Sequence, residues 1–117
     1  MRKQEQILIN EKALAIWEKA CAELYSDNGR WFYEFKAISK NRLRSCTAWV
    51  YETTNYYLLK SYGTFIACIE KSSDTCVDVL RYEYGYTSTS AQHIAKFRHD
   101  YGSGKWGCEH ELRYYSV

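Results

Sequence analysis

The sequence predicts an α+β domain in which an antiparallel sheet of about five to six strands packs against two helices on one side. Two observations lead to this fold class. Apolar residues recur every three or four positions in two segments and every second position in the others, in the order helix, strands, helix, strand. The 117 residues also match the commonest size of one domain, and no linker or repeat interrupts them. We therefore expect residues 1–117 to form a single domain.

The first helix is predicted from about Gln4 or Asn10 to Tyr25. Its apolar residues recur at spacings of three and four, and charged residues occupy the opposite side. The apolar stripe consists of Ala13, Leu14, Ile16, Trp17, Ala20, Cys21 and Leu24. Asp27–Gly29 is the predicted stop, because Asn and Gly tolerate the left-handed conformation that ends helices.

Five strand-like segments follow the first helix. They are rich in aromatic and β-branched residues, and short turn sequences separate the later ones. The segments are Trp31 to Ile38, Cys46 to Tyr51, Tyr56 to Tyr62, Thr64 to Glu70 and Cys76 to Tyr82. Gly63 and the polar turn before Cys76 suggest hairpins, so we expect an antiparallel meander.

A second helix is predicted from Ser90 to Tyr101, with Ile94 and Phe97 in its apolar stripe. Thr89 is its expected cap, because Gln92 follows at the spacing of a capping box. Two glycines then end the helix, and Trp106 to Tyr115 alternates as a last strand.

Composition and cysteine usage indicate a reduced protein of the cytoplasm. The net charge of +2 is too balanced to imply nucleic-acid binding by itself. No apolar run has the length of a membrane span, and the N-terminus lacks the apolar stretch of a signal peptide. The cysteines are odd in number and lack a CxxC pair, unlike a secreted disulfide framework. They are Cys21, Cys46, Cys68, Cys76 and Cys108.

Metal binding and catalysis find little support in the sequence. Cys108 and His110 would share a face of the last strand, but no CxxC or HxxxH spacing supplies further ligands. A thiol nucleophile would need a cysteine beside His93, yet burial in a strand raises the pKa of a thiol. We therefore expect no cofactor, no metal and no catalytic residue. An enzyme with Cys/His chemistry is the third alternative.

The segment from Lys36 to Arg44 carries four positive charges and no acid within nine residues. It falls largely in the predicted connection between the first two strands, so its side chains could reach a phosphate backbone. The alternative is a solvated hairpin tip whose charge discourages edge pairing. The candidate partner-binding residues in this segment are Lys40, Arg42 and Arg44.

Aromatic residues exceed what the core of one small sheet needs, since the chain contains 12 Tyr, 4 Trp and 4 Phe. Several rings should therefore be exposed, where Tyr and Trp commonly anchor protein partners. Tyr84 and Tyr86 share a face if their segment is extended, and we take them as further candidates for partner binding. Hydroxyl residues follow as far as Ser90 and could cap the second helix or hold an anion.

The stretch from Tyr84 to Gly102, YGYTSTSAQHIAKFRHDYG, resembles a group of small uncharacterised proteins of phages and integrative mobile elements of gut bacteria. The likeness extends to Tyr57–Thr64 and to Trp106–His110, and covers about half the chain. It implies a stoichiometric inhibitor of a host defence system, like the anti-CRISPR proteins, that binds a host protein or ribonucleoprotein in the bacterial cytoplasm. A nucleic-acid-binding accessory protein that uses the basic segment is the alternative.

Overall fold

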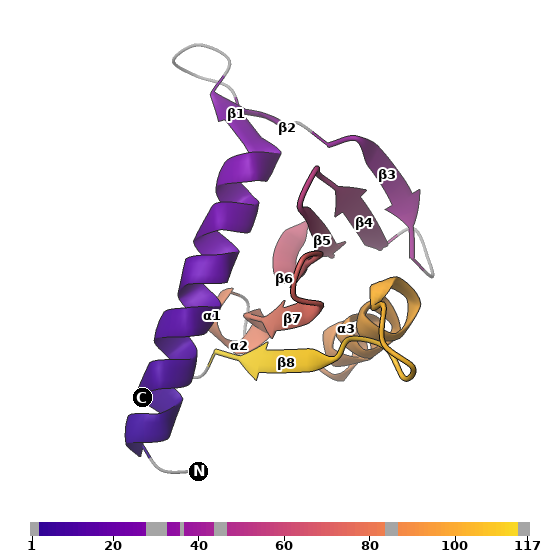
Figure 1. Ribbon diagram of the computed structural model, residues 1–117. Coiled ribbons are helices and arrows are strands. Elements are labelled where there is room, and N and C mark those ends of the chain that lie inside the picture. The colour runs from indigo at the N-terminus through magenta and orange to yellow at the C-terminus, as the bar shows by residue number, and fades with distance from the viewer. Residues whose placement is uncertain (1–2, 28–32, 36, 44–46, 84–86, 115–117) are drawn as a thin grey trace.

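The computed structural model describes residues 3–27, 33–35, 37–43, 47–83 and 87–114 (Figure 1). Six strands form one sheet in the order β3-β4-β5-β6-β7-β8, and β1 and β2 form a separate two-stranded ribbon. The α+β class is thereby confirmed. In chain order, the elements are α1 (Lys3–Leu24), β1 (Tyr25–Asp27), β2 (Tyr33–Phe35), β3 (Ser39–Arg42), β4 (Ala48–Glu52), β5 (Tyr56–Ser61), β6 (Thr64–Glu70), β7 (Thr75–Asp78), α2 (Leu80–Glu83), α3 (Ser88–Tyr101) and β8 (His110–Arg113).

The central strands bury side chains on both faces, and this overturns the prediction that both helices lie on one side. Along β5, Leu58 packs in the same cluster as α1, whereas the next residue, Leu59, packs in the cluster of α3. The same alternation separates Cys68 from Ile69 on β6. Because neighbouring residues of a strand point to opposite faces, an apolar pair of this kind needs a cover on each face. Figure 1 shows α1 on one side of the sheet and α3 on the other.

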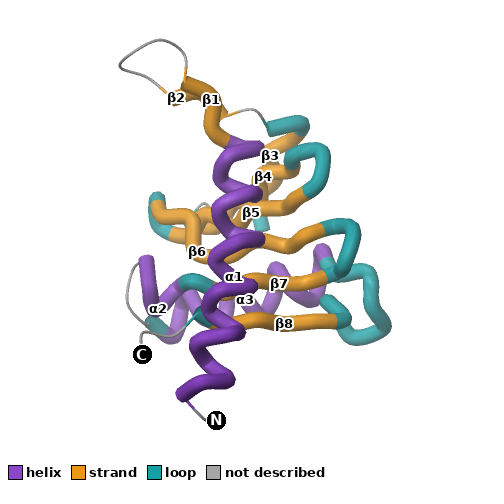
Figure 2. Tube along the Cα trace, turned by 60° about the vertical axis from the view of Figure 1, so that its left-hand side comes forward, coloured by secondary structure: helices purple, strands orange, loops and turns teal. Residues whose placement is uncertain are grey.

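The helix α1 crosses the strands of the sheet, as Figure 2 shows, and contacts β5, β6, β7 and β8. Its predicted stripe is confirmed by the burial of Ala13, Ile16, Trp17, Ala20 and Leu24. The stripe continues toward the N-terminus through two buried polar residues. The Nε2 of Gln6 donates to Asn10 Oδ1 at 2.7 Å and to the carbonyl of Arg113 at 3.0 Å. The helix starts at Lys3. Its first turns are joined to the end of β8 by polar side chains rather than by apolar ones.

Neighbouring strands of the six-stranded sheet run antiparallel except β7 and β8, which run parallel. A parallel pair needs a crossover connection, and here α2 and α3 supply it. The strand predicted up to Tyr82 ends earlier, because Asp78 Oδ1 accepts from the amide of Leu80 at 2.9 Å and α2 begins there. The last strand is likewise shorter than predicted, and Trp106 is exposed outside it.

In its described residues, the first predicted strand, Trp31 to Ile38, contributes no strand residue to the six-stranded sheet, since β3 begins at Ser39. Its described part Tyr33–Phe35 pairs with Tyr25–Asp27, which follows α1 directly. The predicted end of the first helix at Tyr25 is confirmed to within one residue, since α1 ends at Leu24 and β1 follows up to Asp27. Asn28 and Gly29 of the predicted stop lie outside the described residues. The segment Ser39–Arg42, which includes the basic residues Lys40 and Arg42, forms β3, where a connection between strands was expected.

The helix α3 is capped by Thr87, not by Thr89 as predicted. Thr87 has extended backbone angles (φ −134°, ψ 144°), and its side chain accepts a hydrogen bond from the amide of Ser90 at 3.2 Å. Thr89 lies within the first turn of the helix and is exposed. Several hydroxyl residues follow one another at the start of this helix, so the sequence alone did not indicate which of them is the cap.

Replacing Thr87 with alanine should lower the free energy of unfolding by about 1 kcal/mol, because one amide of the first turn loses its acceptor. The matched substitution Thr89→Ala should be neutral or slightly stabilising, since alanine is the better helix former. Urea denaturation of both variants checks this. Equal losses at the two positions would contradict the assignment of the cap.

Asp74 lies in the turn between β6 and β7 and is buried, with a side-chain carboxylate that binds the returning chain. Its Oδ1 accepts from the amide of Ser103 at 2.9 Å, and its Oδ2 accepts from the amide of Glu109 at 2.7 Å. The amide of His110, the first residue of β8, donates to the Asp74 carbonyl at 3.1 Å. Burial raises the pKa of this carboxyl, but the amide donors outweigh burial and hold the pKa below its usual value. One side chain thus aligns β8 with β7.

The substitution Asp74→Asn should destabilise the protein at pH 7 by about 2 kcal/mol, because charge-assisted hydrogen bonds to the carboxylate are lost. Asn tolerates the left-handed backbone of this residue (φ 52°), so the change isolates the charge. A carboxyl whose folded pKa is depressed stabilises the fold above its unfolded pKa of about 3.9, and this contribution is lost as the pH falls through the folded pKa. The difference in unfolding free energy between wild type and variant should therefore shrink below pH 4. A difference that stays constant with pH would show that the charge has no such role.

Candidate functional site

The strand β3 forms one edge of the six-stranded sheet and carries two of the predicted site residues, Lys40 and Arg42, both exposed. Within the described part of the chain, no strand pairs with its outer side. Pairing with β4 continues past both ends of β3, since the amide of Ile38 donates to Glu52 at 2.6 Å and that of Leu43 donates to Ala48 at 2.9 Å. The edge therefore presents an extended backbone from residue 38 to residue 43.

The hydrogen-bond pattern decides which backbone groups of β3 face outward. Leu43 donates to Ala48, its neighbour in register, so Leu43 belongs to a hydrogen-bonded pair with β4. Hydrogen-bonded and non-hydrogen-bonded pairs alternate along an antiparallel ladder. Counting back from Leu43, Arg42 and Lys40 occupy the non-hydrogen-bonded positions. Their backbone N–H and C=O groups therefore point away from β4, toward the outer side of β3.

Cations and aromatic rings interleave on one face of this edge. Register pairing places Lys40 opposite Tyr51, and Trp49 lies between Arg42 and Lys60. The Lys40 Nζ lies 4.6 Å from the centre of the Trp49 ring and 5.4 Å from that of Tyr51. The Arg42 guanidinium carbon lies 5.4 Å from the Trp49 ring centre. Ammonium and guanidinium groups are attracted to the faces of such rings, so the rings hold the cations in position.

A third cation extends this face toward β6. The Lys60 Nζ lies 5.5 Å from the centre of the Phe65 ring, and Phe65 meets Tyr51 edge to face with ring centres 5.2 Å apart. We call this set the basic–aromatic surface. Its members are Lys40, Arg42, Trp49, Tyr51, Lys60 and Phe65.

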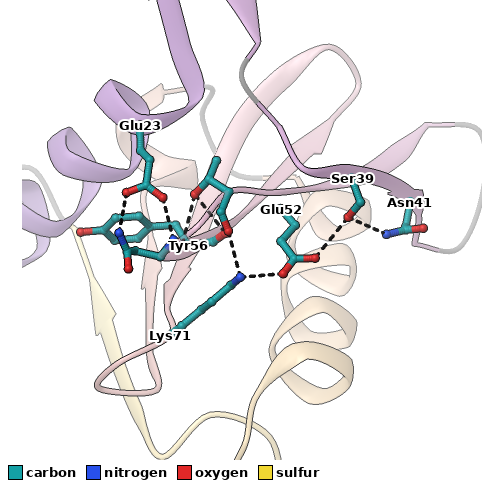
Figure 3. A network of polar contacts seen from close by, with 8 residues as sticks. Glu23, Ser39, Asn41, Glu52, Tyr56 and Lys71 are labelled. Atoms are coloured by element: carbon teal, nitrogen blue, oxygen red, sulfur yellow. Dashed lines mark hydrogen bonds and ion pairs between the residues drawn. The ribbon is translucent and has the colours of Figure 1, made fainter.

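A chain of polar contacts fixes β3 to the rest of the sheet (Figure 3). Asn41 Nδ2 donates to Ser39 Oγ at 3.3 Å, and Ser39 Oγ donates to Glu52 Oε1 at 3.2 Å. The other oxygen of Glu52 binds Lys71 Nζ at 2.6 Å, and this ammonium also donates to the carbonyl of Thr53 at 2.8 Å. The Lys71 ammonium, outweighing partial burial, lowers the pKa of Glu52, which therefore stays ionised near neutral pH.

The same network reaches α1 through the turn between β4 and β5. Glu23, in the last turn of the helix, accepts from the Asn55 amide at 2.6 Å and from Asn55 Nδ2 at 3.0 Å. The hydroxyl of Thr53 accepts from the amide of Tyr56 at 3.2 Å and closes the turn. Polar contacts thereby join α1, the turn between β4 and β5, and β3, as Figure 3 shows. These contacts fix the position of β3 relative to α1.

Only part of the predicted site can be placed. Lys40 and Arg42 lie together on β3, whereas Arg44, Tyr84 and Tyr86 lie outside the described residues. Sequence reasoning missed the residues of β4, β5 and β6 that surround the two cations. Their strands were predicted, but the pairing register that brings them to one face is a tertiary property. The alternation of Trp49 and Tyr51 with apolar residues was the available signal.

His93, the base considered for a thiol nucleophile, is bound to a hydroxyl instead. Its Nδ1 lies 2.9 Å from Ser61 Oγ, which lies 3.2 Å from Ser90 Oγ. All three residues are buried between β5 and α3. Cys108 precedes β8, so it does not share a strand face with His110 as predicted. In residues 3–114 as far as they are described, no group of three His, Cys, Asp or Glu side chains could hold a metal ion.

A second charged cluster lies where α3 meets β8. The guanidinium of Arg98 pairs with Glu111, and Arg113 Nε lies 2.9 Å from the same carboxylate and 3.8 Å from Asp78. Burial raises the pKa of Asp78, partly offset by an amide hydrogen bond and nearby arginines. These charges satisfy one another, so we assign the cluster to packing of the crossover rather than to a ligand.

Removing the Ser61 hydroxyl should destabilise the fold by about 1–3 kcal/mol, because His93 and Ser90 lose a buried hydrogen-bond partner. The substitution Ser88→Ala changes an exposed hydroxyl in the first turn of α3 and serves as the control. Thermal and urea unfolding of Ser61→Ala measure the loss. A stability equal to that of the control would show that the buried hydroxyls have another role.

Comparison of the chain with protein-family models, with curated proteins and with solved structures finds no match. The helices of the described residues include none long and apolar enough to cross a membrane. The surface of the molecule, and above all β3, is therefore where a function can be recognised.

Proposed function

We propose that this chain is a non-enzymatic binding protein that takes an acidic, extended segment of a partner protein onto β3. The observation that carries the proposal is an edge strand whose outer side pairs with no described strand and whose outward backbone groups belong to two cationic residues, Lys40 and Arg42. A peptide that adds a strand to such an edge gains main-chain hydrogen bonds, and its side chains are then read by the neighbouring surface.

The side chains along the edge favour a peptide with both acidic and apolar residues. Ile38 directly precedes β3 and is 67% exposed, so an apolar side chain lies at the start of the edge. An acidic residue opposite Lys40 or Arg42 would be attracted, whereas a second copy of the same basic edge would be repelled. The charge thus discourages self-pairing and admits a complementary partner.

A protein partner fits this surface better than a nucleic acid. Tyr51 and Phe65 are only 5% and 8% exposed, so these rings are not free to stack on bases. The net charge of +2 adds little general attraction to a polyanion. Nucleic acid is the second candidate because Lys40, Arg42 and Lys60 gather three positive charges on one face. In the setting that the phage resemblance implies, the proposed partner is a host protein bound in stoichiometric amounts.

The double substitution Lys40→Glu and Arg42→Glu should weaken capture of the partner at least tenfold. The matched control is Lys12→Glu with Lys19→Glu, which makes the same charge change on the exposed side of α1. Wild type and both variants are used as bait in lysate of a bacterial host, with and without nuclease. We expect a protein that survives nuclease and is lost only with the β3 variant. Loss with both variants, or loss on nuclease treatment, would overturn the proposal.

A second comparison tests whether the backbone of β3 takes part. Lys40→Pro and Lys40→Ala both remove the charge, but only proline removes the outward N–H, and proline is tolerated where the N–H of an edge strand faces solvent. Once the captured protein is in hand, proline should weaken its binding clearly more than alanine does, with little difference in melting temperature. Equal affinities would argue against strand addition and leave a side-chain contact.

A further inference from the structure

Two thiols from distant parts of the chain meet on the α3 side of the sheet. Cys76 lies on β7 with no exposed surface, and Cys108 lies half-buried just before β8. The two side chains lie close enough for each to shift the pKa of the other. Both belong to the packing cluster of α3, and Cys108 Sγ also lies 3.8 Å from the carbonyl of Arg98. Cys108 is thus the more exposed of the two thiols, and Cys76 has no contact with solvent.

The fold holds the segment of Cys108 close to β7 by several independent contacts. Asp74, two residues before Cys76, binds the amide of Glu109, the residue after Cys108. Gly102 permits the close approach, because a Cβ there would lie 2.2 Å from the amide nitrogen of Cys108. Gly107 has a φ of +121°, which other residues rarely adopt. The backbone around Cys108 is therefore held in a defined position beside the turn that precedes β7.

The two thiols differ in chemical character. The neighbouring Cys108 thiol, together with burial, raises the pKa of the Cys76 thiol. The neighbouring Cys76 thiol lowers the pKa of Cys108, whereas partial burial and the Asp74 carboxylate oppose this and the Arg98 guanidinium adds to the lowering. A thiolate, not a thiol, attacks an oxidant. Cys108 is accordingly the attacking group and Cys76 the resolving group.

We propose that Cys76 and Cys108 form a reversible disulfide when the protein meets a peroxide. The Cys108 thiolate attacks one peroxide oxygen, the O–O bond breaks, and hydroxide leaves to take up the proton that the thiol released. This gives a sulfenic acid on Cys108. The Cys76 sulfur then attacks the Cys108 sulfur, the S–O bond breaks, and the hydroxyl leaves as water with the proton of Cys76. Two thiols and one hydrogen peroxide become one disulfide and two waters.

The other described cysteines provide an internal comparison. Burial first, and then the charges of Glu83 and Glu18, raise the pKa of Cys21 to about 11. Burial raises the pKa of Cys68 strongly as well. Both lie on the α1 side of the sheet, away from the cluster that holds Cys76. They should stay reduced under conditions that oxidise Cys108.

The test treats the reduced, full-length wild-type protein with equimolar hydrogen peroxide at pH 7 and measures intact mass and proteolytic peptides. The expected product has lost two hydrogen atoms, contains a Cys76–Cys108 cross-link, and returns to the starting mass with dithiothreitol. Its melting temperature should rise by several degrees, because the cross-link closes a long loop of the unfolded chain. Oxidation of Cys108 to sulfinic acid without a cross-link, or a disulfide between other cysteines, would overturn the proposal. So would a Cys108 that stays reduced.

Variants separate the two roles. In Cys76→Ala the sulfenic acid on Cys108 cannot be resolved by its neighbour, so a dimedone adduct at Cys108 should accumulate to several times the wild-type amount. In Cys21→Ala the cross-link should form as in wild type. If Cys76→Ala does not fold, the peptide map of the wild-type protein decides alone. A folded Cys76→Ala that shows no increase of adduct at Cys108 would refute the assignment of the attacking thiol.

Discussion

Burial of the central strands on both faces is the constraint on which the rest of this structure depends. Adjacent positions on β5 and β6 are apolar, as at Leu58 and Leu59, so each face of the sheet exposes a hydrophobic surface that water cannot satisfy. The long helix α1 covers one face and the shorter α3 covers the other. The chain must therefore pass from one side of the sheet to the other. It does so by the crossover after β7, which is why β8 returns parallel to its neighbour.

Polar interactions are concentrated where this two-sided packing ends. At one edge, the Glu52–Lys71 pair and the hydroxyl of Ser39 connect β3 to the sheet. At the other edge, Arg98 and Arg113 share the carboxylate of Glu111. Neither helix packs mainly on β3, so its cations lie over aromatic rings rather than under a helix. The cations of the basic–aromatic surface thus lie at the margin of the core, next to rings of which Tyr51 and Phe65 belong to the core itself.

The sequence was most informative where turns and periodicity agree. The strand β6 runs from Thr64 to Glu70 as predicted, because Gly63 and a polar turn mark its ends. The stripe of α1 was recognised, but buried Gln6 and Asn10 concealed its first turns, since their burial depends on partners elsewhere in the fold. Adjacent apolar residues in β5 indicate a strand that is buried on both faces. The prediction that both helices lie on one side did not take this pattern into account.

The candidate site was less predictable than the core. Lys40 and Arg42 were identified by charge, but the density of charge suggested a loop where the chain forms a strand. Their neighbours Trp49 and Lys60 became part of the site only through the register of three strands. A register is a relation between segments, and no single segment encodes it. Local patterns therefore gave the residue types of the surface without its geometry.

The carboxylate of Asp74 has a consequence for the order in which the protein assembles. Asp74 sits in a hairpin turn, which closes a short loop and can form early, whereas its amide partners Ser103 and Glu109 lie 29 and 35 residues away. Pairing across such separations is the slow part of folding for a small domain. The hairpin of β6 and β7 thus offers a preformed acceptor to a segment that arrives later. We therefore expect parallel addition of β8 to follow formation of the hairpin, with the Asp74 turn as its template.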